Sequence, residues 1–255
     1  MTADGEGGPP KVELDGHRAT ITLRRPRHHN RLEPPDLAAL MQILERLRAL
    51  PALRVAVLTA TGRSFSSGFH IGSFGAATEA PPLDAVVDAL ETLPVPVICA
   101  LNGSVYGGAT DLALACDFRI GTEGMQLVMP AARLGLHYYP SGLRRFVSRL
   151  GLNTAKKLFL AAEPLDTAAL LACGYLDEAV PPEALAARTD ALAAQIAGHA
   201  PLAVRGMKAA LNDIARGAAD DAAIGARAEA LAGSADFAEG RRAWSEKRAP
   251  LFQGR

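Results

Sequence analysis

The sequence predicts an α/β fold followed by a helical C-terminal third. Two short apolar runs, residues 54–59 and 95–101, are rich in β-branched residues and end in turn formers, as buried parallel strands do. Segments with apolar residues at helical spacing separate the predicted strands up to residue 180, and this alternation is typical of a parallel sheet covered by helices. From Pro140 onward the sequence is mostly helical, with breaks at glycine and proline.

The N-terminal elements follow from local signals. Residues 1–10, rich in glycine, proline and acidic residues, are expected to form a loose tail. The pair at residues 15–16, Asp-Gly, lies between two apolar runs and predicts a β-hairpin over residues 12–23. Residues 34–36, Pro-Pro-Asp, begin a predicted helix with apolar residues at helical spacing over 37–47.

Each of the two central strands is followed by a segment that contains glycine. The first glycine segment, residues 64–71, reads Ser-Phe-Ser-Ser-Gly-Phe-His-Ile, and the second glycine segment, residues 102–111, reads Asn-Gly-Ser-Val-Tyr-Gly-Gly-Ala-Thr-Asp. In the second segment, Gly107 and Gly108 open an apolar helical stretch, whose first amides have no partner within the helix. Two such turns side by side would offer two N–H groups to a developing oxyanion. The alternative is a plain tight turn into a helix.

The remaining elements complete the alternation. Residues 83–93 are predicted to form a short helix after a loop at 72–82. Residues 117–120 and 125–128 are plausible strands, and the alanine-rich last third is predicted to form a helical layer.

The composition limits the classes of protein that the chain can represent. Its 255 residues are 49% hydrophobic and 21% charged, which is ordinary for a globular protein. The formal net charge of +0 gives no electrostatic case for nucleic acid or an anionic membrane, and no apolar run is as long as a membrane span. Cys99, Cys116 and Cys173 have neither metal-ligand spacing nor a disulfide pattern, so we expect a cytoplasmic protein in which Cys99 and Cys116 are buried.

Taken together and in order, several short motifs resemble the crotonase (enoyl-CoA hydratase/isomerase) superfamily over almost the whole chain. Each motif is weak alone, but their order and spacing are highly specific. The motifs lie at residues 25–30, 65–68, 102–108, 116–117, 130–135, 201–203 with Lys208, and 236–254.

The resemblance implies a crotonase-like spiral of ββα units over residues 11–195 and a helical region over 196–255 that packs a homotrimer or a dimer of trimers. It implies a coenzyme A thioester as ligand, with no separate cofactor and no metal. The thioester carbonyl would accept hydrogen bonds from the N–H groups of Phe69 and Gly108. Further residues that would line the coenzyme or the acyl group are Arg27, His29, Ser67, His70, Ile71, Tyr106, Gly107, Pro130 and Ala131. By the same alignment Lys208 is expected at the surface or on a coenzyme phosphate.

The sequence departs from the family's hydratase pattern at both catalytic carboxylates. Family hydratases use two glutamates, one as base toward water and one as acid at the α carbon. The first position holds Asp111, which is three residues after Gly108 and shorter by one methylene. The second position aligns with Ala131, which cannot transfer a proton. Asp111 could alternatively only complement the helix dipole.

Two tyrosines fill the region after Ala131. Methylmalonyl-CoA decarboxylase, a member of the superfamily, also lacks the second glutamate and has a tyrosine that matches Tyr138. The match is partial, because that enzyme has a histidine at the position of Phe69, whereas His70 comes one residue later here. Tyr139 occupies the position at which other members carry an aspartate. Both tyrosines could instead pack in the core or at a trimer contact.

The sequence therefore predicts an acyl-CoA enzyme of the enoyl-CoA hydratase/isomerase type that stabilises an enolate. Phe69 and Gly108 would supply the N–H donors, and Asp111 with Tyr138 or Tyr139 would handle protons. One alternative is decarboxylation of a malonyl-type thioester through Tyr138. Another is an acyl-CoA-binding protein without catalysis, which the loss of the second glutamate at Ala131 suggests.

Overall fold

The described part of the chain, residues 7–73 and 79–255 of a computed structural model, forms two sheets flanked by helices. Within it, a six-stranded sheet has the order β1-β2-β3-β4-β6-β9, and a three-stranded sheet has the order β5-β7-β8. The strands are β1 (Gly8–Asp15), β2 (Arg18–Arg24), β3 (Val55–Ala60), β4 (Val97–Leu101), β5 (Val105–Tyr106), β6 (Phe118–Thr122), β7 (Gln126–Val128), β8 (Leu165–Asp166) and β9 (Glu178–Val180). The α-helices are α1 (Pro34–Arg48), α2 (Leu83–Glu91), α3 (Gly108–Leu114), α4 (Pro140–Lys156), α5 (Thr167–Ala172), α6 (Leu185–Ala197), α7 (Pro201–Ala215), α8 (Asp221–Ala232) and α9 (Ala235–Glu246).

The predicted hairpin is present and starts earlier than expected. β1 pairs antiparallel with β2, and Gly8 already pairs with Arg24. The expected tail of residues 1–10 was therefore too long, because residues 8–10 belong to the sheet. β1 is an edge strand, where proline is tolerated because one side of the strand has no ladder to complete. Residues 1–6 lie outside the described residues.

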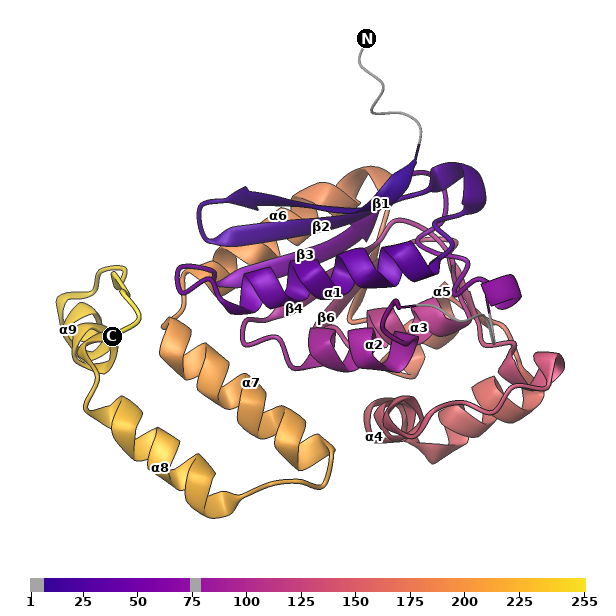
Figure 1. Ribbon diagram of the computed structural model, residues 1–255. Coiled ribbons are helices and arrows are strands. Elements are labelled where there is room, and N and C mark those ends of the chain that lie inside the picture. The colour runs from indigo at the N-terminus through magenta and orange to yellow at the C-terminus, as the bar shows by residue number, and fades with distance from the viewer. Residues whose placement is uncertain (1–6, 74–78) are drawn as a thin grey trace, which may run out of the picture.

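The central strands bury both faces of the larger sheet, as the apolar runs predicted. Successive side chains of a strand point to opposite faces. Val55 and Val57 of β3 pack with Leu185 of α6, whereas Ala56 and Leu58 belong to the core formed with α1 and α2. The sheet consequently lies between α6 on one side and α1 and α2 on the other (Figure 1).

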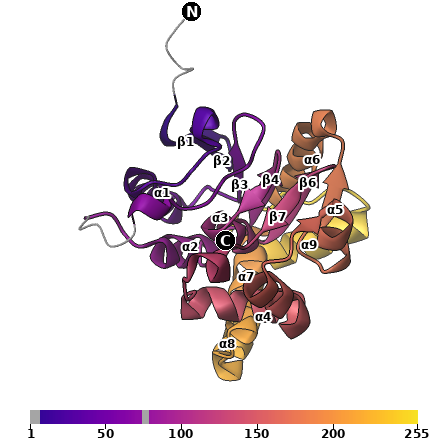
Figure 2. The same ribbon diagram turned by 90° about the vertical axis from the view of Figure 1, so that its right-hand side faces the viewer.

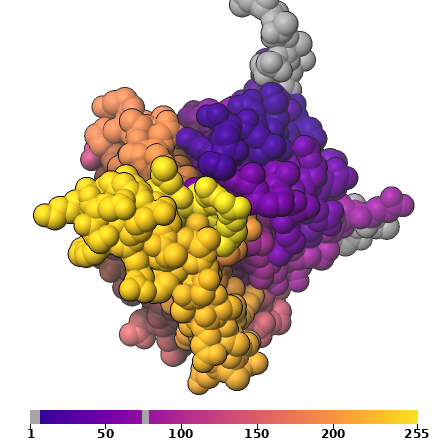
Figure 3. All heavy atoms as spheres, turned by 90° about the vertical axis from the view of Figure 1, so that its left-hand side faces the viewer, coloured from indigo at the N-terminus to yellow at the C-terminus, as the bar shows by residue number. Residues whose placement is uncertain are grey.

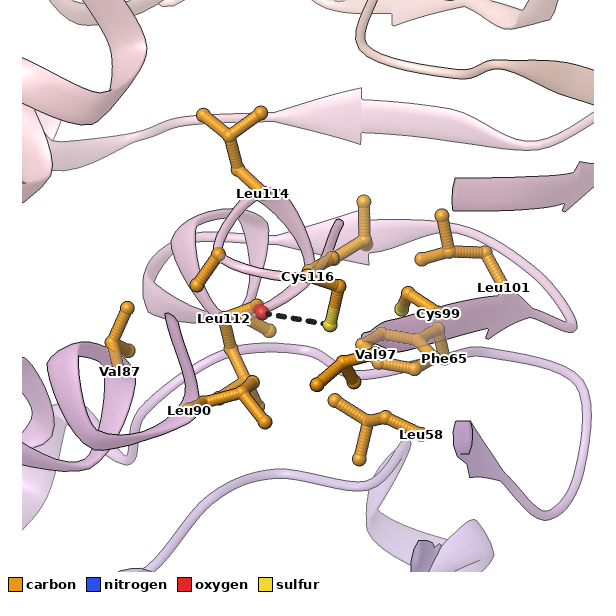
Figure 4. Packing of buried hydrophobic residues seen from close by; sticks show 14 of the residues in the cluster. Leu58, Phe65, Val87, Leu90, Val97, Cys99, Leu101, Leu112, Leu114 and Cys116 are labelled. Carbon is orange, nitrogen blue, oxygen red and sulfur yellow. Dashed lines mark hydrogen bonds between the residues drawn. The ribbon is translucent and has the colours of Figure 1, made fainter. Parts of the chain in front are cut away.

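The core on the α1 and α2 side contains both cysteines that were expected to be buried. Cys99 of β4 and Cys116, which follows α3, are fully buried, which confirms that expectation. Figure 4 shows them among Leu58, Phe65 and Leu112, and the Cys116 thiol donates a hydrogen bond to the Leu112 carbonyl at 3.6 Å. They behave as small apolar side chains here.

Strands that follow one another alternate between the two sheets before a helix begins. β4 enters the larger sheet and β5 the smaller, and α3 follows; β6 and β7 then repeat this step before α4. The predicted α/β spiral of ββα units is confirmed. Its repetition brings β5 and β7 side by side in parallel, with Tyr106 opposite Val128.

Helices α8 and α9 extend away from the rest of the molecule, whereas α7 packs against α4 (Figures 1 and 2). In Figure 3 these two helices lie on the face toward the viewer, α8 in gold and α9 in yellow. The end of the chain is tied back to α9, because the N–H groups of Gln253 and Gly254 donate to Asp236 at 2.7 and 2.8 Å. None of the helices in the described ranges combines the length and apolar character needed to cross a membrane.

Candidate active site

The two glycine segments lie side by side, main chain against main chain. The Tyr106 N–H donates to the Ser66 carbonyl at 3.0 Å, which joins the segments through β-type hydrogen bonding. Gly68 has a positive φ of 89°, and a Cβ on it would lie 2.6 Å from the Tyr106 carbonyl oxygen and 3.3 Å from the Gly108 nitrogen. Only glycine fits this approach, because any other side chain would overlap the neighbouring main chain.

Gly108 is the first residue of α3, and its N–H donates to no other described residue. The turn before it is fixed by the Gly107 N–H, which donates to the Val128 carbonyl of β7 at 2.9 Å. Phe69 is its neighbour across the segments, since a Cβ on Gly108 would lie 3.8 Å from that of Phe69. We call Gly68, Phe69, Gly107 and Gly108 the glycine wall.

The glycine wall forms one side of a pocket of about 380 Å³. Its lining includes nine of the residues expected from the sequence: Ser67, Phe69, Ile71, Gly107, Gly108, Pro130, Ala131, Tyr138 and Tyr139. The other lining residues are Ser73, Pro82, Leu83, Asp84, Met129, Leu134, Leu136 and His137. Sequence reasoning missed Leu83 and Asp84, because α2 carries no motif that distinguishes its first turn from an ordinary helix start.

The remaining expected residues lie outside the pocket lining. Arg27 is exposed in a 3₁₀ turn, and the His29 carbonyl accepts from the Ser67 N–H at 2.8 Å, so their loop adjoins the first glycine segment. His70 contacts Ser73 through its ring, at 3.2 Å.

Two more expected residues lie behind the pocket. Tyr106 contributes its carbonyl to the contact with Gly68. Asp111 is fully buried, and its carboxylate reaches the pocket only through a lining tyrosine.

Tyr138 and Tyr139, which we call the tyrosine wall, connect the pocket to Asp111. The Tyr139 hydroxyl donates to Asp111 Oδ2 at 2.6 Å, and the Tyr138 hydroxyl donates to that of Tyr139 at 3.2 Å. The two rings stack with centroids 4.3 Å apart. Gly142 makes room for them, since a Cβ there would lie 2.4 Å from the Tyr138 ring and 2.9 Å from Asp111 Oδ2.

A buried arginine holds Asp111 in place. Arg145 of α4 donates from Nη1 to both oxygens of Asp111, at 2.8 and 2.7 Å, and from Nε to Glu91 at 2.9 Å. Asp88 and Arg149 complete the network around Arg145 and Glu91. The sequence did contain a signal for this network. Arg145 and Arg149 lie one turn apart on α4 beside the buried Phe146, and arginines in such a position are usually paired with carboxylates.

The electrostatic environment keeps both tyrosines neutral. Burial, and then the negative charge of Asp111, raise the pKa of Tyr138 and Tyr139 well above the ordinary value. Burial also raises the pKa of Asp111, while Arg145 and the Tyr139 hydroxyl oppose that rise. The N–H and O–H donors directed at Asp111 match an ionised carboxylate, and the tyrosines therefore act as neutral phenols.

Ala131 and Lys208 occupy contrasting positions. Ala131 is buried and lines the pocket, as expected of a residue near the acyl group. The expectation for Lys208 was wrong: it is buried, and its ammonium group donates to Asp117 at 2.7 Å and to the Val95 carbonyl at 2.9 Å. It fixes α7 to the start of β4 and contacts no part of the pocket.

Two neighbouring glycine turns thus lie beside a pocket. The profile of the enoyl-CoA hydratase/isomerase family matches residues 16–255. The chain belongs to that family.

Similar proteins support the family assignment over nearly the full length of this chain. An (E)-benzylidenesuccinyl-CoA hydratase of Thauera aromatica is 32% identical, with 96% of this chain and 99% of the relative covered. An enoyl-CoA isomerase/hydratase of Mycosarcoma maydis is 30% identical, with 92% of each covered. The crystal structure of an enoyl-CoA hydratase from Bacillus anthracis superposes with a TM-score of 0.89 at 28% identity, over 97% of this chain and 100% of the other.

Proposed function

We propose that the protein acts on an acyl-CoA thioester and stabilises its enolate through the N–H groups of Phe69 and Gly108. The observation that carries this proposal is the glycine wall, where two main-chain segments meet at one side of the pocket. An enolate oxygen needs donors that are in place beforehand, and main-chain amides meet this need without reorganisation. Coenzyme A would extend toward the loop of Arg27 and His29 and enters only as part of the substrate.

Proton transfer would run through the tyrosine wall to Asp111. An ionised carboxylate only accepts hydrogen bonds, so Tyr139 donates to Asp111 and Tyr138 donates to Tyr139. The Tyr138 oxygen is then left to accept from a group in the pocket, such as a water molecule. When water adds to the double bond of an enoyl thioester, its proton passes along this chain to Asp111, and the chain returns one proton when the enolate is protonated at the α carbon.

In this proposal hydration depends on one carboxylate, Asp111, which acts through the hydroxyl groups of Tyr138 and Tyr139. Ala131 stands in the place of the second glutamate. Asp111 is a positioning residue and proton store in this scheme, and Tyr138 and Tyr139 are the groups that face the substrate.

Mass spectrometry of products formed in D₂O tests the proposal. The enzyme is incubated with crotonyl-, malonyl- and methylmalonyl-CoA together. We expect water to add to crotonyl-CoA, with deuterium at the α carbon. Absence of deuterium from all three thioesters would contradict enolate chemistry and favour the binding protein without catalysis.

Decarboxylation of a malonyl-type thioester is the second candidate, because Tyr138 lines the pocket and a neutral tyrosine hydroxyl could orient a carboxylate. Loss of CO₂ from either malonyl compound, and loss of that reaction in Tyr138→Phe, would establish it. A Tyr138→Phe variant that still decarboxylates at the full rate would remove Tyr138 from the assignment.

We further propose that the protein is a homotrimer or a dimer of trimers in the cytoplasm, and that α7, α8 and α9 form the contacts between its subunits. Large apolar side chains are exposed on these helices, including Met207, Leu211, Ile214 and Trp244. A groove of about 710 Å³ runs between them, lined by Leu202, Leu231 and Phe237 among others. Light scattering coupled to size-exclusion chromatography measures the number of subunits, and a monomer would contradict this part of the proposal.

A further inference from the structure

Asp84 is the only carboxylate that lines the pocket in the described part of the chain. The other ionisable lining side chains are His137, Tyr138 and Tyr139, and this part of the lining contains no lysine and no arginine. His137 is exposed, and its ring Nδ1 contacts the Tyr138 carbonyl at 2.8 Å. The neutral tyrosines add no charge. The fixed charge on the pocket wall is therefore negative.

The two aspartates near the pocket differ in how their charge is balanced. Asp111 is paired with Arg145, whereas Asp84 forms no ion pair with any described residue. Asp84 is the second residue of the nine-residue helix α2, and its Oδ1 accepts from the Ala85 N–H at 3.0 Å. A helix N-terminus favours an ionised carboxylate, because the helix dipole is positive there.

The first turn of α2 packs directly against the glycine wall. A Cβ on Gly108 would lie 2.4 Å from Cδ2 of Leu83, the residue before Asp84. After burial and the charge of Asp111, the charge of Asp84 is a further cause of the raised pKa of Tyr138. Asp84 thus lines the pocket next to the residue that packs on the glycine wall, and its charge acts on the tyrosine wall. An acyl group held at the glycine wall would share this pocket with it.

Apart from Asp84, the side chains around this space are mainly apolar. They include Phe69, Ile71, Leu83, Met129, Leu134 and Leu136. An uncharged acyl chain gains from contact with such walls. A carboxylate at the end of the acyl chain would lose water there and would meet Asp84 without a cation to offset the repulsion.

We propose that Asp84 is a specificity-determining residue that admits acyl groups without a negative charge and excludes those that end in a carboxylate. This inference rests on the proposed hydration, because it requires an acyl-CoA thioester in the pocket, and it argues against the malonyl-type decarboxylation, whose substrates end in a carboxylate. It deepens that function by assigning the substrate class: thioesters of uncharged, mainly apolar acids.

Binding of two unreactive thioesters tests the proposal. Pentanoyl-CoA and glutaryl-CoA have acyl chains of equal length and differ in the terminal carboxylate, so the contribution of coenzyme A cancels in the ratio of their Kd values. Titration calorimetry at one pH and one ionic strength measures both Kd values. We expect the wild-type protein to bind glutaryl-CoA about tenfold or more weakly than pentanoyl-CoA.

Two variants separate the role of Asp84 from that of helix charge in general. Asp84→Asn retains the shape and the acceptor for Ala85, and we expect it to bring the two Kd values to within about threefold. Glu45→Gln removes the same charge from an exposed position of α1 that does not line the pocket, and we expect it to retain the wild-type ratio.

The outcomes distinguish this inference from the proposed function. Equal affinity of the wild-type protein for both thioesters, or a ratio unchanged by Asp84→Asn, would overturn the role of Asp84 while leaving acyl-CoA binding intact. If neither thioester binds to the wild-type protein, the proposed function itself fails.

Discussion

The glycine wall and the tyrosine wall face the same pocket but are built in different ways. The glycine wall consists of main chain, and strand-type hydrogen bonds from Tyr106 and Gly107 hold it to its neighbours. The tyrosine wall consists of side chains, and its hydroxyls end on Asp111, which depends on Arg145. The glycine wall is therefore fixed by local backbone geometry, whereas the tyrosine wall depends on a buried network of charges from three helices.

The largest expected effect comes from breaking the network behind the tyrosine wall. Arg145→Met leaves Asp111 and Glu91 buried without their main cation, and we expect the free energy of unfolding to fall by about 3–5 kcal/mol. Urea unfolding at neutral pH measures it. Arg144→Met, at the exposed neighbouring position, is the control and should change stability by less than about 0.5 kcal/mol. Equal effects of the two substitutions would contradict the importance of the network.

The next effect removes one donor from the glycine wall without changing the tyrosine wall. Gly108→Pro eliminates the N–H at the first position of α3, where proline is otherwise accommodated. Because a Cβ at this position meets Leu83, the substitution is made in a Leu83→Ala background, with Gly108→Ala in the same background as the control. We expect kcat to fall about 100- to 1000-fold relative to that control. Equal kcat values would exclude the Gly108 N–H from catalysis.

A smaller effect tests how closely the tyrosine wall is packed. Gly142→Ala places a methyl group against Tyr138 and Asp111, and we expect a loss of about 1–3 kcal/mol in unfolding free energy, together with lower turnover. Gly225→Ala is the matched control, because a Cβ there meets nothing within 4 Å in α8 and should stabilise the helix slightly. If the two substitutions changed the free energy of unfolding equally, close packing of the tyrosine wall around Gly142 would be contradicted.

The smallest effect concerns the dependence of stability on pH. Burial would raise the pKa of Glu91, but hydrogen bonds from Arg145 and the charges of Arg145 and Arg149 outweigh it, so that the pKa is lowered. A carboxyl group with a lowered pKa stabilises the folded protein at pH values above its pKa in the unfolded chain, which is about 4.3 for glutamate. This contribution is lost as the pH falls through the pKa of Glu91 in the folded protein. Glu91→Gln should therefore reduce the free energy of unfolding at neutral pH. Below about pH 4 that free energy should fall less steeply with pH than in the wild-type protein. Unfolding curves across this range measure the slope, and an unchanged decline would contradict the assignment.

Much of the fold and of the glycine wall could be predicted from the sequence, because both depend on local signals. The hairpin at Gly16, the helix beginning at Pro34 and the buried runs that became β3 and β4 follow from turn chemistry and hydrophobic period. The close approach of Gly68 to Tyr106 requires glycine, so the need for it is visible in the motif itself.

The tertiary structure alone decided what surrounds Asp111 and which carboxylate lines the pocket. Asp111 was expected to handle protons together with Tyr138 or Tyr139, but the sequence did not indicate that packing of α3 against α4 turns its carboxylate to Arg145 and places Tyr139 between it and the pocket. Asp84 and Lys208 show the same limit, because one lines the pocket and the other is buried against Asp117. Sequence patterns report which residues a helix or strand buries, whereas ion-pair partners are set by contacts between distant elements, and those form only when the chain is folded.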